Sequence, residues 1–301
     1  MPLALRLNKK SAKTIVLVGF ILTSGAWLFS RAGESPGQLA LVYHQSRWGE
    51  YGPEITRALA SNPETLPLEL EVVYGGVVPH HLPVTIPRLV NFYRRLARHQ
   101  TVKNFIILGP DHVNAGRGPI TVSAASFFSD TNELLPLANL AEALVAAKLA
   151  VIDESPFELE HSIGAQTLVI SRLFPDARVT PIIFRSDASP EQALNLGEKL
   201  AHYLDNETVL IASVDFSHYL ATSQARPIDQ LSGQILEQLN LADLSLIKAD
   251  SPAALTTWLS AMRAKGALAS AGLEVLNTND LMQNSDYTTG YVFGYWGRAL
   301  D

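Results

Sequence analysis

The chain has 301 residues and 47% hydrophobic content, enough to bury the core of one large domain or two small ones. It contains no cysteine, which excludes disulfides, thiolate nucleophiles and thiolate metal ligands. Residues 1–33 carry five basic side chains and no acidic one, so the remaining 268 residues carry 18 basic and 29 acidic side chains, a net charge of 18 − 29 = −11. An acidic body of this kind lacks the positive surface that nucleic acids require, so we expect no nucleic-acid partner.

An uncharged apolar segment runs from Thr14 to Ser30 and follows three lysines. This layout is typical of an N-terminal membrane anchor or a signal peptide, with the basic flank in the cytoplasm. The sequence therefore predicts a hydrophobic helix within residues 1–33. The protein would be anchored in a membrane by this helix, with its body outside the cytoplasm, and the alternative is secretion after signal cleavage. Residues 34–301 are then expected to form one domain.

Strand and helix patterns alternate along that body. The apolar periodicities predict strands at 38–43, 68–78, 120–124, 178–184 and 291–296, and further strands within 102–112 and 207–220. They predict helices at 53–60, 86–99, 137–149, 162–173, 190–204, 228–247 and 252–264. This alternation indicates an α/β sandwich, in which a largely parallel central sheet is flanked by helices.

Three of the apolar runs end in polar, histidine-bearing motifs. These motifs are VVPHH (77–81), LGPDH (108–112) and SVDFSH (213–218). Ligands of open α/β sheets bind beyond the carboxyl ends of the strands. We therefore expect the three motifs to meet in one crevice.

Each motif also has a purely structural interpretation. Neighbouring side chains of an extended chain point to opposite faces, so only one of His80 and His81 is expected to enter a given site. Asp111 could orient His112 or share a cation with it, or it could cap backbone amides in a turn.

The remaining two polar patterns leave similar alternatives. Glu160 and His161 precede a predicted helix, where an acid would cap free amides and His161 could belong to a site. Asp215 and His218 are three residues apart and would lie on one side of a helical turn, either as a metal-binding or acid–base pair or as a helix cap.

Several common catalytic motifs are missing from the sequence. It has no G-x-S-x-G nucleophile elbow, and neither a GxGxxG nor a GxxxxGK[ST] phosphate loop.

The sequence resembles the Memo-like family, which includes the bacterial AmmeMemoRadiSam system protein B group. The resemblance is carried by four motifs that occur in the same order, namely VVPHH, ILGPDH, EHSIGAQ and SVDFSHY. The resemblance covers approximately residues 70–219 and, more loosely, 286–295. It implies a fold similar to that of class III extradiol dioxygenases, which hold a non-haem iron with two histidines and a carboxylate. It also suggests a radical-SAM protein from the same gene neighbourhood as a partner.

The resemblance implies that His80 and His112 are metal ligands. Asp215 and His218 would line the same pocket, with His161 nearby. The family's further metal ligand is a cysteine in the last third of the chain, and no substitute is obvious at residues 261–268. Either Asp215 completes the site or metal binding is weakened or lost.

Three functions remain open from the sequence. The first is a membrane-tethered protein whose His80, His112 and Asp215 form a triad suited to Fe(II). If this protein oxidises a catechol-like small molecule, His218 or His161 would be the catalytic acid or base. The second is a metal-dependent hydrolase. The third is a module without chemistry that binds a peptide or another partner in the crevice.

Overall fold

The computed structural model describes residues 26–27, 42–44, 49–61, 66–129, 132–283 and 287–300. Its main sheet has eight strands in the order β11-β12-β3-β10-β4-β9-β5-β8. In chain order they are β3 (Leu70–Val78), β4 (Asn104–Pro110), β5 (Ile120–Val122), β8 (Val151–Ile152), β9 (Arg178–Phe184), β10 (Thr208–Ser213), β11 (Ala269–Asn277) and β12 (Gly290–Ala299).

The centre of this sheet is parallel. β10 pairs in parallel with both β3 and β4, and β4 pairs in parallel with β9. β12 is antiparallel to both β3 and β11, and β5 is antiparallel to β9. The expected α/β fold with a mostly parallel sheet is thus confirmed.

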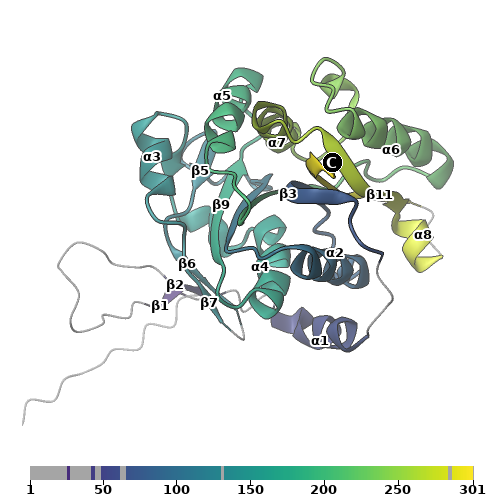
Figure 1. The fold of residues 1–301 in the computed structure, drawn as a ribbon, viewed down its shortest axis with the longest axis horizontal. Coiled ribbons are helices and arrows are strands. Elements are labelled where there is room, and N and C mark those ends of the chain that lie inside the picture. The colour runs from purple at the N-terminus through teal and green to yellow at the C-terminus, as the bar shows by residue number, and fades with distance from the viewer. Residues whose placement is uncertain are drawn as a thin grey trace, which may run out of the picture.

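Helices cover both faces of the sheet (Figure 1). Buried side chains beneath α2 and α4 form one core, and those beneath α3, α5 and α7 form the other. The α-helices are α1 (Gly52–Ala60), α2 (Ile86–His99), α3 (Leu140–Ala146), α4 (His161–Leu173), α5 (Pro190–Ala201), α6 (Thr222–Glu237), α7 (Pro252–Lys265) and α8 (Thr278–Met282).

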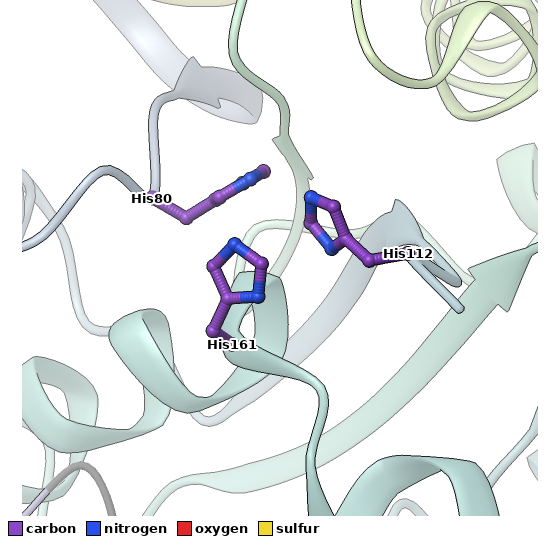
Figure 2. A group of neighbouring side chains, drawn as sticks. All are labelled: His80, His112 and His161. Atoms are coloured by element: carbon purple, nitrogen blue, oxygen red, sulfur yellow. The ribbon is translucent and has the colours of Figure 1, made fainter.

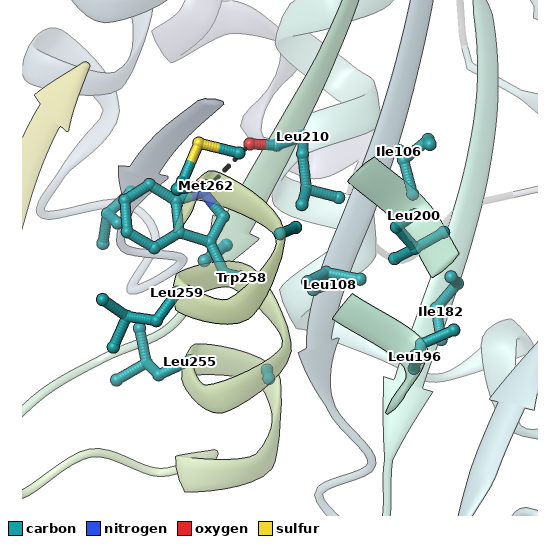
Figure 3. Close-up of a cluster of buried hydrophobic side chains, with 14 of the residues drawn as sticks. Ile106, Leu108, Ile182, Leu196, Leu200, Leu210, Leu255, Trp258, Leu259 and Met262 are labelled. Atoms are coloured by element: carbon teal, nitrogen blue, oxygen red, sulfur yellow. Dashed lines mark hydrogen bonds between the residues drawn. The ribbon is translucent and has the colours of Figure 1, made fainter. Parts of the chain in front are cut away.

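The core under α7 is built around Trp258 (Figure 3). This side chain is fully buried, its Nε1 donates a hydrogen bond to the carbonyl of Leu210 on β10 (3.2 Å), and its ring meets that of Trp296 edge-on. The contact fixes α7 on the central strand, and so it also fixes the loop that precedes α7.

Helices α5 and α7 lie unusually close together. A Cβ on Gly197 would stand 2.3 Å from the carbonyl oxygen of Thr257 and 2.5 Å from Cβ of Ser260. Glycine at 197 is therefore required by the close approach of the two helices.

The last third of the chain departs from the predicted pattern. α6 begins at Thr222, although Pro227 lies within it, and it ends at Glu237. The 3-10 turn Leu244–Leu246 follows, and β11 was not predicted at all. β11 was missed because it is an edge strand with mixed burial and shows no clean alternation of polar and apolar residues.

A small second sheet has the strand order β1-β2-β6-β7. Its strands are β1 (Ala26–Trp27), β2 (Val42–His44), β6 (Ser126–Phe128) and β7 (Glu133–Leu134).

The predicted membrane-anchored localisation is wrong. Within the described residues, no helix has the length and apolar character needed to cross a bilayer. The apolar segment Thr14–Ser30 lies outside the described residues except for β1, and β1 pairs with β2 as a strand. At Ala26 and Trp27 the apolar composition suggested a helix, but these two residues form a strand, because composition alone does not fix the backbone conformation.

Candidate metal centre

Three neighbouring strands deliver polar side chains to one edge of the sheet. His80, His112 and Asp215 each lie two residues beyond the last residue of β3, β4 and β10. β10 lies between β3 and β4, so the three chain ends are adjacent. The predicted meeting of the three motifs at the carboxyl ends of the strands is therefore observed.

Three imidazole rings converge at this edge (Figure 2). The ring of His161, at the start of α4, stacks on that of His112 with centroids 3.9 Å apart. The ring of His80 meets the other two edge-on, at 5.2 Å from His112 and 5.0 Å from His161. One nitrogen from each ring lies within 4.8 Å of the others, which is close enough for a shared metal ion.

Two carboxylates complete a second group around His80. Nε2 of His80 lies 3.2 Å from Oδ2 of Asp250 and 3.8 Å from Oδ2 of Asp215. Asp250 Oδ2 is also 3.9 Å from Nε2 of His112. Ligands about 2.0–2.2 Å from one ion are separated from each other by roughly 3–4 Å, so this spacing suits a metal.

The backbone fixes the two carboxylates relative to each other. The amide of Asp250 donates to the carbonyl of Asp215 (3.0 Å), and the amide of Asp215 donates to Oδ2 of Asp250 (3.1 Å). The other oxygen of Asp215, Oδ1, accepts from the amide of His80 (3.1 Å). The loop before α7 is thereby tied to the end of β10.

Glu160 both caps α4 and orients His112. Its Oε1 lies 2.8 Å from the amide of Ser162 and 2.8 Å from Nδ1 of His112, and its Oε2 accepts from the His112 amide (3.0 Å). A carboxylate on Nδ1 leaves Nε2 as the ring's free nitrogen, the arrangement typical of metal-bound histidine. Burial alone would raise the pKa of Glu160, but its contacts with His112 lower it to about 2.

The surroundings push the pKa values of the site histidines apart. Burial lowers the pKa of His80, but attraction to Asp215, Asp250 and Glu160 outweighs burial and raises it to about 9. Burial, followed by repulsion from His80 and His112, lowers the pKa of His161 to about 4. In the metal-free protein at neutral pH, His80 is therefore protonated and His161 is neutral.

Two buried atoms of the site make no hydrogen bond within the described residues. They are Nε2 of His80 and Oδ1 of Asp250. Within the described residues, Nε2 of His80 has only the ion-pair contacts to Asp250 and Asp215, and buried polar atoms without a hydrogen bond are costly. A cation held by the His80 ring and the Asp250 carboxylate would give both atoms a partner. The donor set therefore fits a metal ion.

Two predicted residues have other surroundings. Asp111 does not orient His112; it accepts from the amides of Ala115 (3.0 Å) and Gly116 (2.8 Å), so the turn-capping alternative describes its contacts. His218 belongs to neither metal-type group of the described residues. The chain after β10 is not helical until α6 begins, so the helical turn that would have placed Asp215 and His218 on one side does not form.

His81 points away from the histidine cluster, as expected for the neighbour of His80. Its Nδ1 lies 2.7 Å from the hydroxyl of Tyr291 on β12.

A pocket opens beside the candidate centre, with an empty volume of about 590 Å³ that includes part of its open mouth. His112 and Asp250 line it together with Arg185, Ser186 and Ala188. The part of the pocket that small molecules can occupy is about 210 Å³, below the roughly 300–1,000 Å³ that is usual for drug-sized ligands, so only a small ligand would fit.

Asp250 is the site residue that sequence reasoning missed. It directly precedes Ser251, which caps the start of α7, whereas the resemblance places the further ligand near residues 261–268. Ten residues of helix span about 15 Å, so that region lies at the far end of α7. The sequence did contain a signal for Asp250. It is an acidic residue directly before the Ser-Pro start of a predicted helix, and it comes after the third motif in the chain.

The fold and these side chains define an α/β protein with a histidine and carboxylate cluster at the carboxyl edge of its parallel strands. The family model for Memo-like protein matches residues 52–260, so the chain belongs to the Memo-like family.

Curated relatives agree with this assignment. A MEMO1 family protein of Caldivirga maquilingensis is 27% identical over 187 residues, covering 59% of this chain and 63% of the relative. One from Methanosarcina mazei is 24% identical over 233 residues, covering 73% and 80%. The matches to the first two relatives thus span 63% of those proteins. An uncharacterized protein of Escherichia coli K12 aligns with a TM-score of 0.43 and 14% identity over 72% of this chain and 99% of its own, a likeness too low to carry an argument.

Proposed function

We propose that this protein binds a divalent metal ion, Fe(II) by preference, through Nε2 of His80, Nε2 of His112 and the carboxylate of Asp250. Asp215, the carboxylate that the sequence suggested, remains in the proposal as the second acidic group of the centre. The observation that carries the proposal is the buried Nε2 of His80, which meets no hydrogen-bond geometry within the described part of the chain and lies at ion-pair distance, 3.2 Å, from Oδ2 of Asp250. Two histidines and one carboxylate are the donor set of non-haem Fe(II) oxygenases.

The proposed chemistry is oxidation of a small, catechol-like ligand in the pocket beside His112. The metal would supply a Lewis-acidic centre with open positions for ligand and oxygen. The protein's own contribution is proton transfer. The ring of His161 stacks on that of His112 beside the centre, so His161 is the proposed acid or base for a ligand that reaches the metal. His218 stays a second proposed acid or base.

Metal content of the anaerobically purified full chain tests the proposal. We expect nearly one metal ion per chain in the wild type and in His202→Ala, which changes an exposed histidine at the end of α5. Loss of metal is expected in both His80→Ala and His112→Ala. Equal metal content in all four proteins would reject the centre and favour an interaction module.

Turnover assays then separate the chemistries. Oxygen consumption with catechols, lost in His161→Gln, is expected for the oxidation. Hydrolysis of generic esters without oxygen consumption would instead identify a metal-dependent hydrolase.

A further inference from the structure

A buried chain of polar side chains lies behind His80, on the side away from Asp250. Nδ1 of His80 is 3.3 Å from Oγ of Ser213, the last residue of β10. Oγ of Ser213 is in turn 2.8 Å from Nε2 of Gln166 on α4, and Oε1 of Gln166 accepts from the hydroxyl of Tyr93 on α2 (2.9 Å). None of these four side chains is more than 1% exposed. These partners are therefore shielded from bulk solvent.

Two backbone carbonyls fix the direction of every hydrogen bond in this chain. Nε2 of Gln166 donates to the carbonyl of Pro79 (3.0 Å), so the amide group faces Ser213 with its nitrogen and Tyr93 with its oxygen. Ser213 donates its single hydroxyl hydrogen to the carbonyl of Ser162 (2.7 Å). Carbonyl oxygens only accept, so neither bond can be reversed.

Ser213 can therefore only accept from His80. Its hydrogen is committed to Ser162, and one lone pair already receives the amide of Gln166. A hydroxyl oxygen has two lone pairs, and the second faces Nδ1 of His80. The ring nitrogen on this side must then carry a hydrogen.

We propose that Ser213, held by Gln166 and Tyr93, is a positioning residue that keeps the hydrogen of neutral His80 on Nδ1 and so leaves Nε2 as the metal-binding nitrogen. In His112 the hydrogen is likewise kept on Nδ1, but by a carboxylate, because Nδ1 of His112 faces Glu160. The assignment of Nε2 as a ligand rests on the proposed metal function. The position of the hydrogen does not.

The ring hydrogen can be read directly by NMR of the protein with ¹⁵N-labelled histidine. In the Zn(II)-loaded full chain, long-range ¹H–¹⁵N spectra are expected to show a protonated Nδ1 and a metal-bound Nε2 for His80. A His80 ring bound through Nδ1 would overturn the proposal.

Variants test whether Ser213 is responsible. Ser213→Ala is expected to weaken Zn(II) binding about 10–100-fold and to speed exchange of the Nδ1 hydrogen with solvent, and Ser213→Thr, which keeps the hydroxyl, is expected to restore both. Ser171→Ala is the matched control, because Ser171 is also fully buried on α4 but bonds the carbonyl of Leu168. Equal losses in Ser171→Ala and Ser213→Ala, or no change in Ser213→Ala, would contradict the positioning role.

Failure of the metal proposal can be told apart from failure of this one. If the wild type binds no Zn(II), the metal function fails, and the hydrogen is then located by the same spectra in metal-free protein at a pH where the His80 ring is neutral. A neutral ring with its hydrogen on Nδ1 supports the role of Ser213, and one with its hydrogen on Nε2 rejects it.

Discussion

Oδ2 of Asp250 lies 3.2 Å from Nε2 of His80, although the two residues come from opposite ends of the domain sequence. His80 follows β3, and Asp250 precedes α7. This contact places a carboxylate in the candidate metal centre of a chain that has no cysteine. Several measurable properties are expected to depend on it.

Replacing Asp250 by asparagine should sharply weaken metal binding, because the change keeps the shape and removes the negative charge. We expect the metal affinity to fall by more than the roughly 10–100-fold that is typical when a residue that only orients a metal ligand is removed. Competition with a chromogenic chelator measures the affinity. Asp176→Asn, on an exposed turn, is the control and should bind as the wild type does. Unchanged affinity in Asp250→Asn would show that Asp250 is not a ligand.

Replacing Asp250 by cysteine should change which metal is preferred. Thiolate favours Zn(II) and Cu(I), whereas carboxylate suits harder ions. We expect Asp250→Cys to gain affinity for Zn(II) relative to Mn(II), measured by paired chelator titrations under reducing conditions. An unchanged Zn(II) to Mn(II) ratio would place Asp250 outside the coordination sphere.

The stability of the metal-free protein should fall as the pH rises from about 6.5 to above 9. The folded-state pKa of His80 is about 9, above its usual value of 6.5. A raised pKa adds stability that is complete below the unfolded pKa and is lost as the pH rises through the folded one. The loss amounts to about 3 kcal/mol, because each pKa unit corresponds to about 1.4 kcal/mol.

Urea unfolding in EDTA between pH 6 and 10 measures this dependence. The quantity to compare is the slope of the free energy of unfolding against pH. The slope of His80→Gln is subtracted from that of the wild type, since other groups titrate in both proteins. His202→Gln should keep the wild-type slope. Identical slopes in the wild type and His80→Gln would refute the assignment of this window to His80.

Gly197→Ala should destabilise the protein, although alanine favours a helix by about 1 kcal/mol over glycine. The new Cβ would stand 2.3 Å from a backbone carbonyl of α7, which cannot move without shifting that helix. Thermal unfolding is the measurement, with Glu198→Ala on the exposed face of α5 as the control. An increase in Tm for Gly197→Ala would mean that the two helices separate easily.

Filling the pocket should block a ligand without removing the metal. Ala188→Trp places a large side chain in the pocket wall and leaves His80, His112 and Asp250 unchanged. We expect full metal content and lost catechol-dependent oxygen consumption. Ala264→Trp, exposed near the end of α7, should retain both. Normal turnover in Ala188→Trp would show that ligands reach the centre by another route.

Much of the fold could be read from local patterns. Helix α2 and strand β9 begin and end where the sequence predicted, because strong amphipathic and apolar periods fix them locally. Prediction was weaker after β10. There, Pro227 concealed the first turn of α6, and β11 depends on pairing with β12 rather than on its own pattern.

The sequence by itself determined which strand ends carry the histidines and the carboxylate, since His80, His112 and Asp215 each follow an apolar run that had to be a buried strand. Only the tertiary structure decided which side chains meet. The order β3-β10-β4 joins distant segments, and the packing of α7 on the sheet brings Asp250 to His80. Local periodicity reports burial and secondary structure, but the pairing of distant segments is decided by strand order and helix packing, which no local pattern encodes.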